Sequence, residues 1–535
     1  MATTVLPTGF VGTPTASQAA VADDPYKNKY LIAIAVTLAA VLELVDTSIV
    51  NVAIPHMMGT FGATLDEIAW VSTSYIIANV IVIPMSNWLS AYFGRRNYLT
   101  GSITIFVVAS FFCGAATSLW GLVFWRVIQG LGGGALLSTA QTTLYEAFPP
   151  HERGIGQSIF GVGVMVGPTL GPTLGGYIVD AYAWPWIFYI NVPLGIFAGY
   201  LVWTYVRDAV HQVKATSVDV IGIVLLTMAV GSLQWMLERG ERFDWFESRF
   251  VTGLAITSVL SAVLLVWREL TIDEPIIDFR ILKSRQVAPG VMFATFLGLA
   301  LYGSVFVLPV FLQQLHGYTA QQTGMVILPG ALASAFTMAF VGRITNRVDA
   351  RPLIVFGAFM FLASMVQMSR LTLDSGQDDL FWPLIFRGVG LGFLFVPLTS
   401  ATVSGLPMRL IGQGTGMFNL MRQLGGSLGI AIMATMLARQ TVVQKQLLTE
   451  HVGAYDPTTM SRLGGLTRSL VARGIDVSIA KQQALMIMDR QIATQASVIA
   501  FSRIYLISGI LLVAALPLLL IWKTGKAAAI KVDLH

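Results

Sequence analysis

Long apolar runs separated by short polar segments dominate the chain. From Tyr30 onward, runs of about 18 to 25 residues recur, and each is long enough to cross about 30 Å of hydrocarbon as a helix. Because only helices and closed barrels satisfy backbone hydrogen bonds in lipid, the pattern predicts an all-α polytopic membrane protein. We expect about fourteen spans, centred near residues 41, 78, 108, 131, 167, 197, 228, 259, 301, 331, 361, 392, 424 and 511.

The composition agrees with lipid as the solvent. Of the 535 residues, 55% are hydrophobic and 11% are charged, and the mean hydropathy is +0.71, whereas a soluble globular protein is about 25% charged. A soluble enzyme is therefore excluded. The single cysteine, Cys113, excludes an internal disulfide framework and a cysteine-based metal site. The net charge of +5 comes with no basic arm carrying interleaved aromatic residues, so we expect no nucleic-acid partner.

Lysine and arginine are distributed unevenly between alternate loops. If the N-terminus is cytoplasmic, 18 of these residues fall in inner segments, against three, Arg239, Arg242 and Arg249, in the short outer loops. Because cytoplasmic loops carry the excess of positive charge, both termini are predicted to be cytoplasmic. The inner set is Lys27, Lys29, Arg95, Arg96, Arg153, Arg207, Lys214, Arg268, Arg280, Lys283, Arg285, Arg343, Arg347, Arg351, Arg409, Lys523, Lys526 and Lys531.

Two motifs occur twice along the chain. The segment 87–96 after the second span is similar to 342–351 after the tenth, and Arg126 opens a glycine-containing motif in the fourth span as Arg387 does in the twelfth. Two six-helix halves with two helices inserted between them explain both repeats. The predicted organisation is a disordered cytoplasmic tail at 1–29, a first bundle at 30–206, two inserted helices at 217–269, a second bundle at 288–436 and 499–522, an extracytoplasmic insert at 440–498 and a cytoplasmic tail at 523–535.

The insert at 440–498 is long and polar. Leu, Ile and Met recur within Gln- and Ala-rich stretches such as 476–498, which suggests amphipathic helices. The insert is either a solvated loop or a docking site for a partner outside the membrane.

The source of free energy is not a nucleotide. The phosphate-cradling GxxxxGK(S/T) loop is absent, and the glycine run at 130–135 lies mid-span with no preceding strand, which favours helix packing over dinucleotide binding. The six histidines lie in loops or tails and make no metal constellation. Ionisable side chains inside the bilayer remain, where each charge costs roughly 2.5 to 3.5 kcal/mol and needs a partner or a role. Four stand out: Glu43, Asp46, Arg126 and Arg387.

Asp46 in the first span and Arg126 in the fourth are expected at one depth. Each lies about seven residues from the outer end of its span, which at 1.5 Å per residue is about 10 Å below the surface. Glu43 precedes Asp46 by three residues and shares its helical face. An opposite charge favours the carboxylate and apolar surroundings favour the neutral acid, so opening the site to water would change its protonation. The pair is either a proton switch or a static ion pair, and Glu43 either takes part in coupling or lines the substrate cavity.

The fifth span, 161–176, contains more glycine and proline than helix propensity alone would support. Small faces let a neighbouring helix approach closely, and proline removes hydrogen bonds and bends the helix. The span is either a pivot or seal between the halves or a site of simple tight packing. The gating candidates within it are Gly167, Pro168, Gly171, Pro172, Gly175 and Gly176.

A substrate cavity is expected between the halves near mid-membrane, where polar groups lie amid aromatic and Met side chains. A Gln within a span can also simply bond to a neighbouring helix. The binding candidates are Glu43, Asn51, Gln129, Gln141, Gln234, Asn419 and Gln423.

Several motifs together resemble the major facilitator superfamily, and within it the fourteen-span drug:proton antiporters of the EmrB/QacA type. The segment 44–55 resembles the first-helix motif, Arg126 with Gln129 and Gly130 resembles the fourth-helix motif, and 161–176 resembles the fifth-helix antiporter motif. The family associates that arginine with proton coupling. Two further segments, 186–193 and 237–246, look more like EmrB than QacA. The resemblance covers nearly the whole chain after residue 30.

One loop departs from the family pattern. After the second helix the family usually has an acidic residue where this chain has Ala91, and a glycine where it has Asn87, while Gly94, Arg95 and Arg96 fit as gating residues. A carboxylate latch at that inner gate is therefore in doubt.

The resemblance implies a major facilitator fold and a secondary active transporter rather than an enzyme. It implies proton-coupled multidrug efflux by alternating access across a bacterial inner membrane, and so a role in antibiotic resistance, with the proton gradient in place of a cofactor and no metal. The implied partners are the lipid bilayer, hydrophobic small molecules, and a periplasmic adaptor (EmrA-like) with an outer-membrane channel. Two alternatives share these sequence features: an exporter of one endogenous metabolite or siderophore, and a non-transporting membrane scaffold or receptor.

Overall fold

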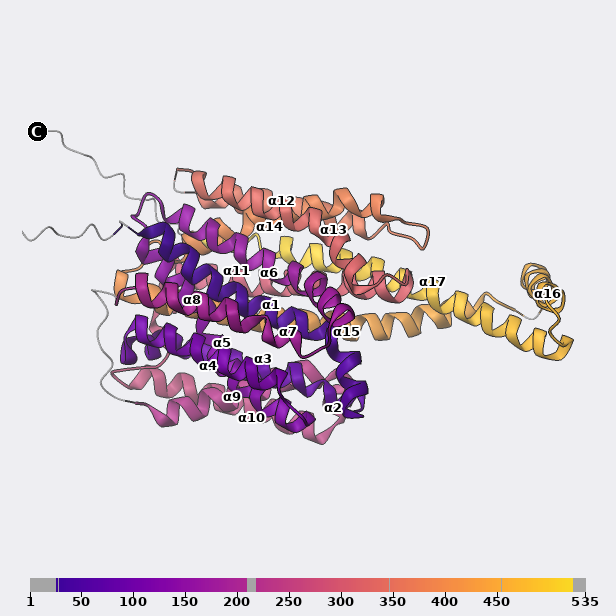
Figure 1. The fold of residues 1–535 in the computed structure, drawn as a ribbon. Coiled ribbons are helices and arrows are strands. Elements are labelled where there is room, and N and C mark those ends of the chain that lie inside the picture. The colour runs from indigo at the N-terminus through magenta and orange to yellow at the C-terminus, as the bar shows by residue number, and fades with distance from the viewer. Residues whose placement is uncertain (1–25, 27, 209–217, 346, 454, 523–535) are drawn as a thin grey trace, which may run out of the picture.

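The computed structural model describes residues 26, 28–208, 218–345, 347–453 and 455–522, and these are almost entirely helical. The helices lie side by side in one bundle, with one pair projecting far beyond it (Figure 1). The predicted tail at 523–535 lies outside the described residues, as do most of the tail at 1–29 and the loop lysine Lys214. The described chain begins and ends at the same end of the bundle, which we call the terminal end; the opposite end is the projection end (Figure 1).

Six membrane-spanning elements make up the first half of the bundle. Two of them are interrupted, so that a short helix precedes the main one. The helices are α1 (Lys29–Phe61), α2 (Leu65–Ile68), α3 (Trp70–Phe93), α4 (Arg95–Gly114), α5 (Leu119–Ala147), α6 (Arg153–Ala181), α7 (Trp186–Tyr189) and α8 (Asn191–Tyr205).

Two inserted helices, α9 (Val220–Arg239) and α10 (Arg249–Thr271), follow and pack against each other. The short 3₁₀ turns Glu241–Phe243 and Trp245–Glu247 join them. This hairpin contacts both halves: Arg242 pairs with Asp66 in α2, and the Trp245 indole donates to the Thr435 hydroxyl at 3.1 Å. The inserted helices therefore bridge the two halves at the projection end.

The second half repeats the six-span pattern. Its helices are α11 (Val287–Leu315), α12 (Ala320–Ile344), α13 (Ala350–Met368), α14 (Gln377–Val403), α15 (Met408–Glu450), α16 (Pro457–Val471), α17 (Val477–Ala514) and α18 (Leu518–Ile521), preceded by the 3₁₀ turn Phe279–Lys283.

Thirteen helices within the described residues are long and apolar enough to cross a membrane. Among the long helices, α5 does not meet this hydropathy criterion. It has 29 residues, and its buried residues include many Gly, Ser, Thr and Gln as well as Arg126. It packs against α1, α3 and α4 inside the first half, so its polar residues face protein rather than lipid. With α5 the bundle has fourteen spans, the number expected from the hydropathy pattern.

Some of the helices begin at a residue whose side chain binds a free backbone N–H group. Ser118 accepts from Gly121 N before α5, and Thr319 forms a reciprocal capping box with Gln322 before α12. Gly94, with φ of +83°, ends α3 and starts α4; at this angle a side chain would be strained, and an added Cβ would lie 3.1 Å from the Asp208 carboxylate. The sharp turn between these two spans therefore depends on glycine.

The predicted insert, 440–498, consists largely of helix that continues from the membrane spans. α15 has 43 residues and α17 has 38, which at 1.5 Å per residue is about 65 and 57 Å, well beyond the hydrocarbon thickness. The two helices run together out of the bundle to α16 (Figure 1). Lys445 pairs with Asp489 at 2.8 Å and Arg503 donates to Gln440 at 3.0 Å, which ties α15 to α17 along this projection.

The apolar core divides by halves and is shared at their junction. One buried cluster belongs to the second half, and two others belong mainly to the first. A fourth joins α3, α9, α10 and α15. The halves meet chiefly along α6 with α12 and α3 with α15, so residues on these helices can report on the relative position of the halves.

Candidate functional site

Asp46 is the centre of a fully buried polar network in the first half. Arg126 Nη1 donates to Asp46 Oδ2 at 2.5 Å, while the amides of Gln129 and Asn191 each donate to Oδ1 at 2.9 Å. The Asp46 side chain is 0% exposed and that of Arg126 1%. Three helices, α1, α5 and α8, therefore meet at one carboxylate whose oxygens are all occupied.

Arg126 is held on every side. Its Nε donates to the Val71 carbonyl at 3.0 Å and its Nη1 also donates to Gln129 Oε1 at 2.7 Å. The guanidinium lies 4.0 Å from the centroid of the Tyr75 ring, a cation–π contact that strengthens where water is excluded. These contacts fix the cation beside Asp46.

Glycines on α5 bring this site together. A Cβ at Gly130 would lie 2.5 Å from the Tyr75 carbonyl oxygen, and one at Gly134 would lie 2.4 Å from the Asn79 carbonyl oxygen. The glycine run at 130–135 therefore serves helix packing, because it lets α5 contact the backbone of α3.

Glu43 lies on the same helix as Asp46 but belongs to a different contact set. Its Oε1 accepts from the Asn79 amide at 2.9 Å, and its buried Oε2 has no hydrogen-bond partner among the described residues. Arg422 on α15, in the second half, lies within electrostatic reach of this carboxylate. Arg422 is 1% exposed and donates to the Tyr302 hydroxyl at 2.5 Å. The sequence analysis did not single out Arg422 or Tyr302.

Arg387 is not part of the Asp46 network. It is buried in α14, where Tyr505 interacts with it electrostatically, and its Nη1 has no hydrogen-bond partner within the described part of the chain. The two arginines of the repeated motif thus have different surroundings: one is fully paired and the other is not.

The predicted binding residues belong to several different hydrogen-bond networks. Gln141 Oε1 accepts from the Asn419 amide at 2.6 Å, across the two halves, and Gln141 Nε2 donates to Gln157 at 3.2 Å. Gln129 belongs to the Asp46 network. Gln234 on α9 donates to Glu238 on the same helix and to Ser427 on α15.

Two further candidates lie apart from these networks. Asn51 is exposed and accepts from the Ser72 hydroxyl at 3.2 Å, and Gln423 is half-buried on α15. Among the predicted set, Glu43, Gln141 and Asn419 are therefore the members that sit at the junction of the halves.

The predicted gate at Gly94, Arg95 and Arg96 makes its contacts inside the first half. Arg95 pairs with Glu146 on α5, the Arg96 backbone N–H donates to Asp208 at 3.0 Å, and the Arg96 guanidinium lies 4.6 Å from the Trp203 ring centroid. These contacts hold the terminal end of the first half together as a unit.

Contacts between the halves at the terminal end come from other residues, which the sequence analysis did not single out. The hydroxyls of Thr142 and Thr415 are 2.6 Å apart, and the Tyr145 hydroxyl donates to the Ser400 carbonyl at 3.4 Å. Asn87 fits against Gly412, where an added Cβ would lie 1.8 Å from its Oδ1. The departure from the family loop thus places an amide where it touches the opposite half.

The glycine face of α6 packs on α1. Cβ atoms at Gly167 and Gly171 would lie 2.7 Å from Leu44 Cβ and 1.8 Å from Ser48 Oγ, and one at Gly175 would lie 2.7 Å from Ile49 Cγ1. Gly176 instead faces Gln321 of α12, with 3.6 Å to the nearest atom. Pro168 and Pro172 lie half-buried within the same helix. One side of α6 therefore contacts the helix that carries Asp46, and another contacts the second half.

This geometry gives a matched pair of substitutions on one helix. Gly171→Ala is expected to destabilise the protein by about 1–3 kcal/mol through overpacking against Ser48, whereas Gly176→Ala should be neutral because its Cβ has room. Thermal unfolding of the two purified variants measures the difference. Equal melting temperatures for both would contradict the close contact between α6 and α1.

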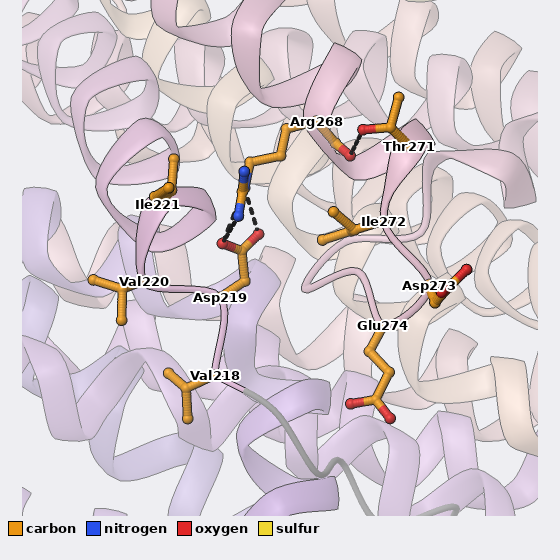
Figure 2. A pocket seen from close by; sticks show the side chains of 9 residues that line it. All are labelled: Val218, Asp219, Val220, Ile221, Arg268, Thr271, Ile272, Asp273 and Glu274. Atoms are coloured by element: carbon orange, nitrogen blue, oxygen red, sulfur yellow. Dashed lines mark hydrogen bonds and ion pairs between the residues drawn. The ribbon is translucent and has the colours of Figure 1, made fainter.

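A separate open cavity of about 680 Å³ lies at the start of α9 and the end of α10, where Arg268 forks onto Asp219 (Figure 2). Arg268 Nη2 lies 2.7 Å and Nε 2.9 Å from the carboxylate oxygens. This hydrogen bonding lowers the pKa of Asp219, so the carboxylate stays ionised. None of the predicted site residues lines the cavity. Within the described ranges, no group of His, Cys, Asp and Glu side chains could hold a metal.

The fold and the buried Asp46 network together define the class of membrane protein. The chain is a multi-pass helical membrane protein with paired halves and charges buried between its spans, and it is a secondary transporter rather than an enzyme. The Major Facilitator Superfamily model matches residues 36–430, and the chain belongs to that family.

The chain matches its relatives over most of their length and its own. The chain is 34% identical over 489 residues to the multidrug export protein EmrB of Escherichia coli strain K12, which covers 90% of this chain and 93% of the relative. It is 31% identical to the fatty acid resistance protein FarB of Neisseria gonorrhoeae, covering 91% and 94%. The crystal structure of a double-tryptophan mutant of XylE shares the fold, with a TM-score of 0.61 at 13% identity, over 93% of this chain and 97% of that one.

Proposed function

We propose that this protein exports hydrophobic compounds of several kinds in exchange for protons, by alternating access. The observation that carries the proposal is the buried Asp46 carboxylate closed on Arg126, Gln129 and Asn191. An intramembrane acid with a single cationic partner is the arrangement that proton uptake can break. The similarity to proteins named for multidrug export supports the choice of substrate class.

Proton uptake at Asp46 would loosen α1. A neutral carboxyl loses its charge-assisted bond to Arg126 and gains an O–H that needs its own acceptor. α1 packs on the glycine face of α6, and α6 packs on α12 of the second half. A change at Asp46 can therefore reach the junction of the halves through two closely packed helix pairs.

Alternation also requires the halves to separate at the terminal end. The Thr142–Thr415, Tyr145–Ser400 and Gln141–Asn419 hydrogen bonds close that end in the present structure. These are few and mostly neutral bonds, each worth on the order of 1 kcal/mol net. Binding of substrate or of a proton can supply enough free energy to open them.

The proton gradient can supply the work. One proton moving down 100 mV releases about 2.3 kcal/mol, and each pH unit adds about 1.4 kcal/mol. Together they support a substrate gradient of a few hundredfold.

Reconstitution into liposomes with an acidic lumen tests the proposal. We expect accumulation of ethidium, a rhodamine and carboxyfluorescein, abolished by nigericin, which collapses the pH gradient, and proton release when a probe is added to the purified protein. Transport of a single compound would favour the exporter of one metabolite, and binding without any proton-driven movement would favour the scaffold or receptor.

We also propose that the protein works in a bacterial inner membrane with both termini cytoplasmic, and that the projection of α15, α16 and α17 binds a periplasmic adaptor (EmrA-like) that leads to an outer-membrane channel. The projection's length supports this, since its helices continue beyond the bilayer. Co-purification of the adaptor with the full chain, compared with a variant in which residues 451–476 are replaced by a short linker, tests the contact; equal recovery would contradict it.

A further inference from the structure

The second half buries positive charge without acidic partners. Between 287 and 437 the acidic residues are Asp349, Asp374, Asp378 and Asp379, all in turns or at helix starts. Arg387 and Arg422 are nevertheless buried in α14 and α15. In the first half, by contrast, Arg126 is matched by Asp46. Burying a cation without an acidic partner costs free energy. Such a residue is therefore expected to have a function beyond stabilising the fold.

Arg422 is the buried cation placed to meet a ligand. Its only hydrogen bond to a side chain in the described residues is to the neutral Tyr302 hydroxyl, at 2.5 Å, and its buried Nε has no partner. The guanidinium also lies 5.6 Å from the Tyr302 ring centroid. A phenol cannot balance its charge, and a guanidinium presents its donors in a planar fork suited to a carboxylate.

Close helix packing fixes this pair in place. A Cβ at Gly298 of α11 would lie 2.0 Å from the Arg422 carbonyl oxygen, and one at Gly426 would lie 2.6 Å from the Tyr302 ring. α11 and α15 therefore contact each other through glycine on both sides of the pair. A side chain held this tightly loses little freedom when it binds, which favours selective recognition.

The acidic group of the first half that interacts electrostatically with Arg422 is Glu43. The two lie within electrostatic reach but form no ion pair, and the Glu43 Oε2 atom that could accept from Arg422 is unpartnered. Asn79, Asp46 and Tyr75 are other polar groups near Glu43. Two buried groups, each with an unpartnered polar atom, thus interact electrostatically although they belong to different halves.

We propose that Arg422 and Tyr302 bind the anionic group of a transported amphiphile, with Glu43 as the counter-charge that the substrate anion replaces. This inference rests on the proposed function, because it identifies the residues that recognise the charge of the transported substrate. An apolar body would lie among the half-buried aromatic and aliphatic residues of α11 and α15. The same site disfavours a cation near Arg422 by like-charge repulsion.

Binding of three probes with one apolar body tests the proposal. These are 4-phenylbutyrate, neutral 4-phenylbutyramide and 4-phenylbutyltrimethylammonium, titrated onto the full protein in lipid nanodiscs at one pH. Arg422→Gln is expected to weaken phenylbutyrate binding about tenfold or more and to leave the other two within about twofold. Arg422→Lys should retain most of the affinity for the anion, and Tyr302→Phe should give a smaller loss.

The outcomes separate recognition from packing. Equal loss for all three probes, or no loss for the anion, would overturn the proposal, as would failure of the wild type to prefer the anion over the amide. Size exclusion and thermal unfolding identify a variant that fails to fold, and Arg422→Lys with Tyr302→Phe then carries the test. Because binding is measured without a gradient, the predicted pattern in a protein that shows no proton-driven transport would overturn the proposed function alone.

Discussion

Replacing Asp46 by asparagine is expected to abolish proton-driven export while leaving the protein folded and inserted. The amide is nearly isosteric and still offers one oxygen to the Gln129 and Asn191 amides, but it cannot ionise or pair with Arg126 as an anion. Transport should fall by at least about a hundredfold, the order expected when a positioned proton-transfer group is removed. The measurement is probe accumulation in liposomes with an imposed pH gradient.

Asp219→Asn is the matched control for this prediction. It also removes a carboxylate paired with an arginine, Arg268, but at the cavity beyond the ends of α9 and α10 (Figure 2). Proton-driven accumulation should persist in this variant. Undiminished transport by Asp46→Asn would show that protons enter through another group and that the Asp46–Arg126 pair is static.

Replacing Arg126 by glutamine is expected to destabilise the protein by about 3–5 kcal/mol, because Asp46 would remain buried without its cation. The double variant Asp46→Asn/Arg126→Gln should recover most of that loss, since neither charge is then unpaired. Thermal or denaturant unfolding of the three purified variants gives the coupling between the two residues.

Transport should remain absent in the double variant even though its stability recovers. If single and double variants are equally unstable, the contact of Arg126 with the Tyr75 ring and the Val71 carbonyl, rather than its charge, accounts for its importance. The comparison therefore separates electrostatic from packing roles at this site.

The spans could be predicted from hydropathy because the membrane imposes a minimum length on every apolar run. The same helical rise put Asp46 and Arg126 at one depth, and the structure shows them in contact. The ends of the helices were harder to predict from the sequence. Hydropathy changes at the membrane surface near residue 440, but nothing in the sequence there stops a helix, so α15 continues to Glu450.

The polar residues inside spans were harder to assign, because depth alone does not say which neighbour a side chain faces. Gln129 follows Arg126 by three residues and so shares its face, and the structure shows its amide bonded to Asp46. Asn191 is a member of that network although it drew notice only as part of a motif. Arg422 was missed, yet a lone charge inside an apolar run is the signal that singled out Arg387.

The continuity of α15 from Met408 to Glu450 has a mechanical meaning. One stiff helix carries Asn419 and Arg422 at the junction of the halves and extends roughly 15 Å past the membrane surface at its other end. A tilt of about ten degrees in the second half would swing this extension by roughly 3 Å. The projection therefore acts as a lever arm, and a protein bound at its tip would be displaced in each transport cycle.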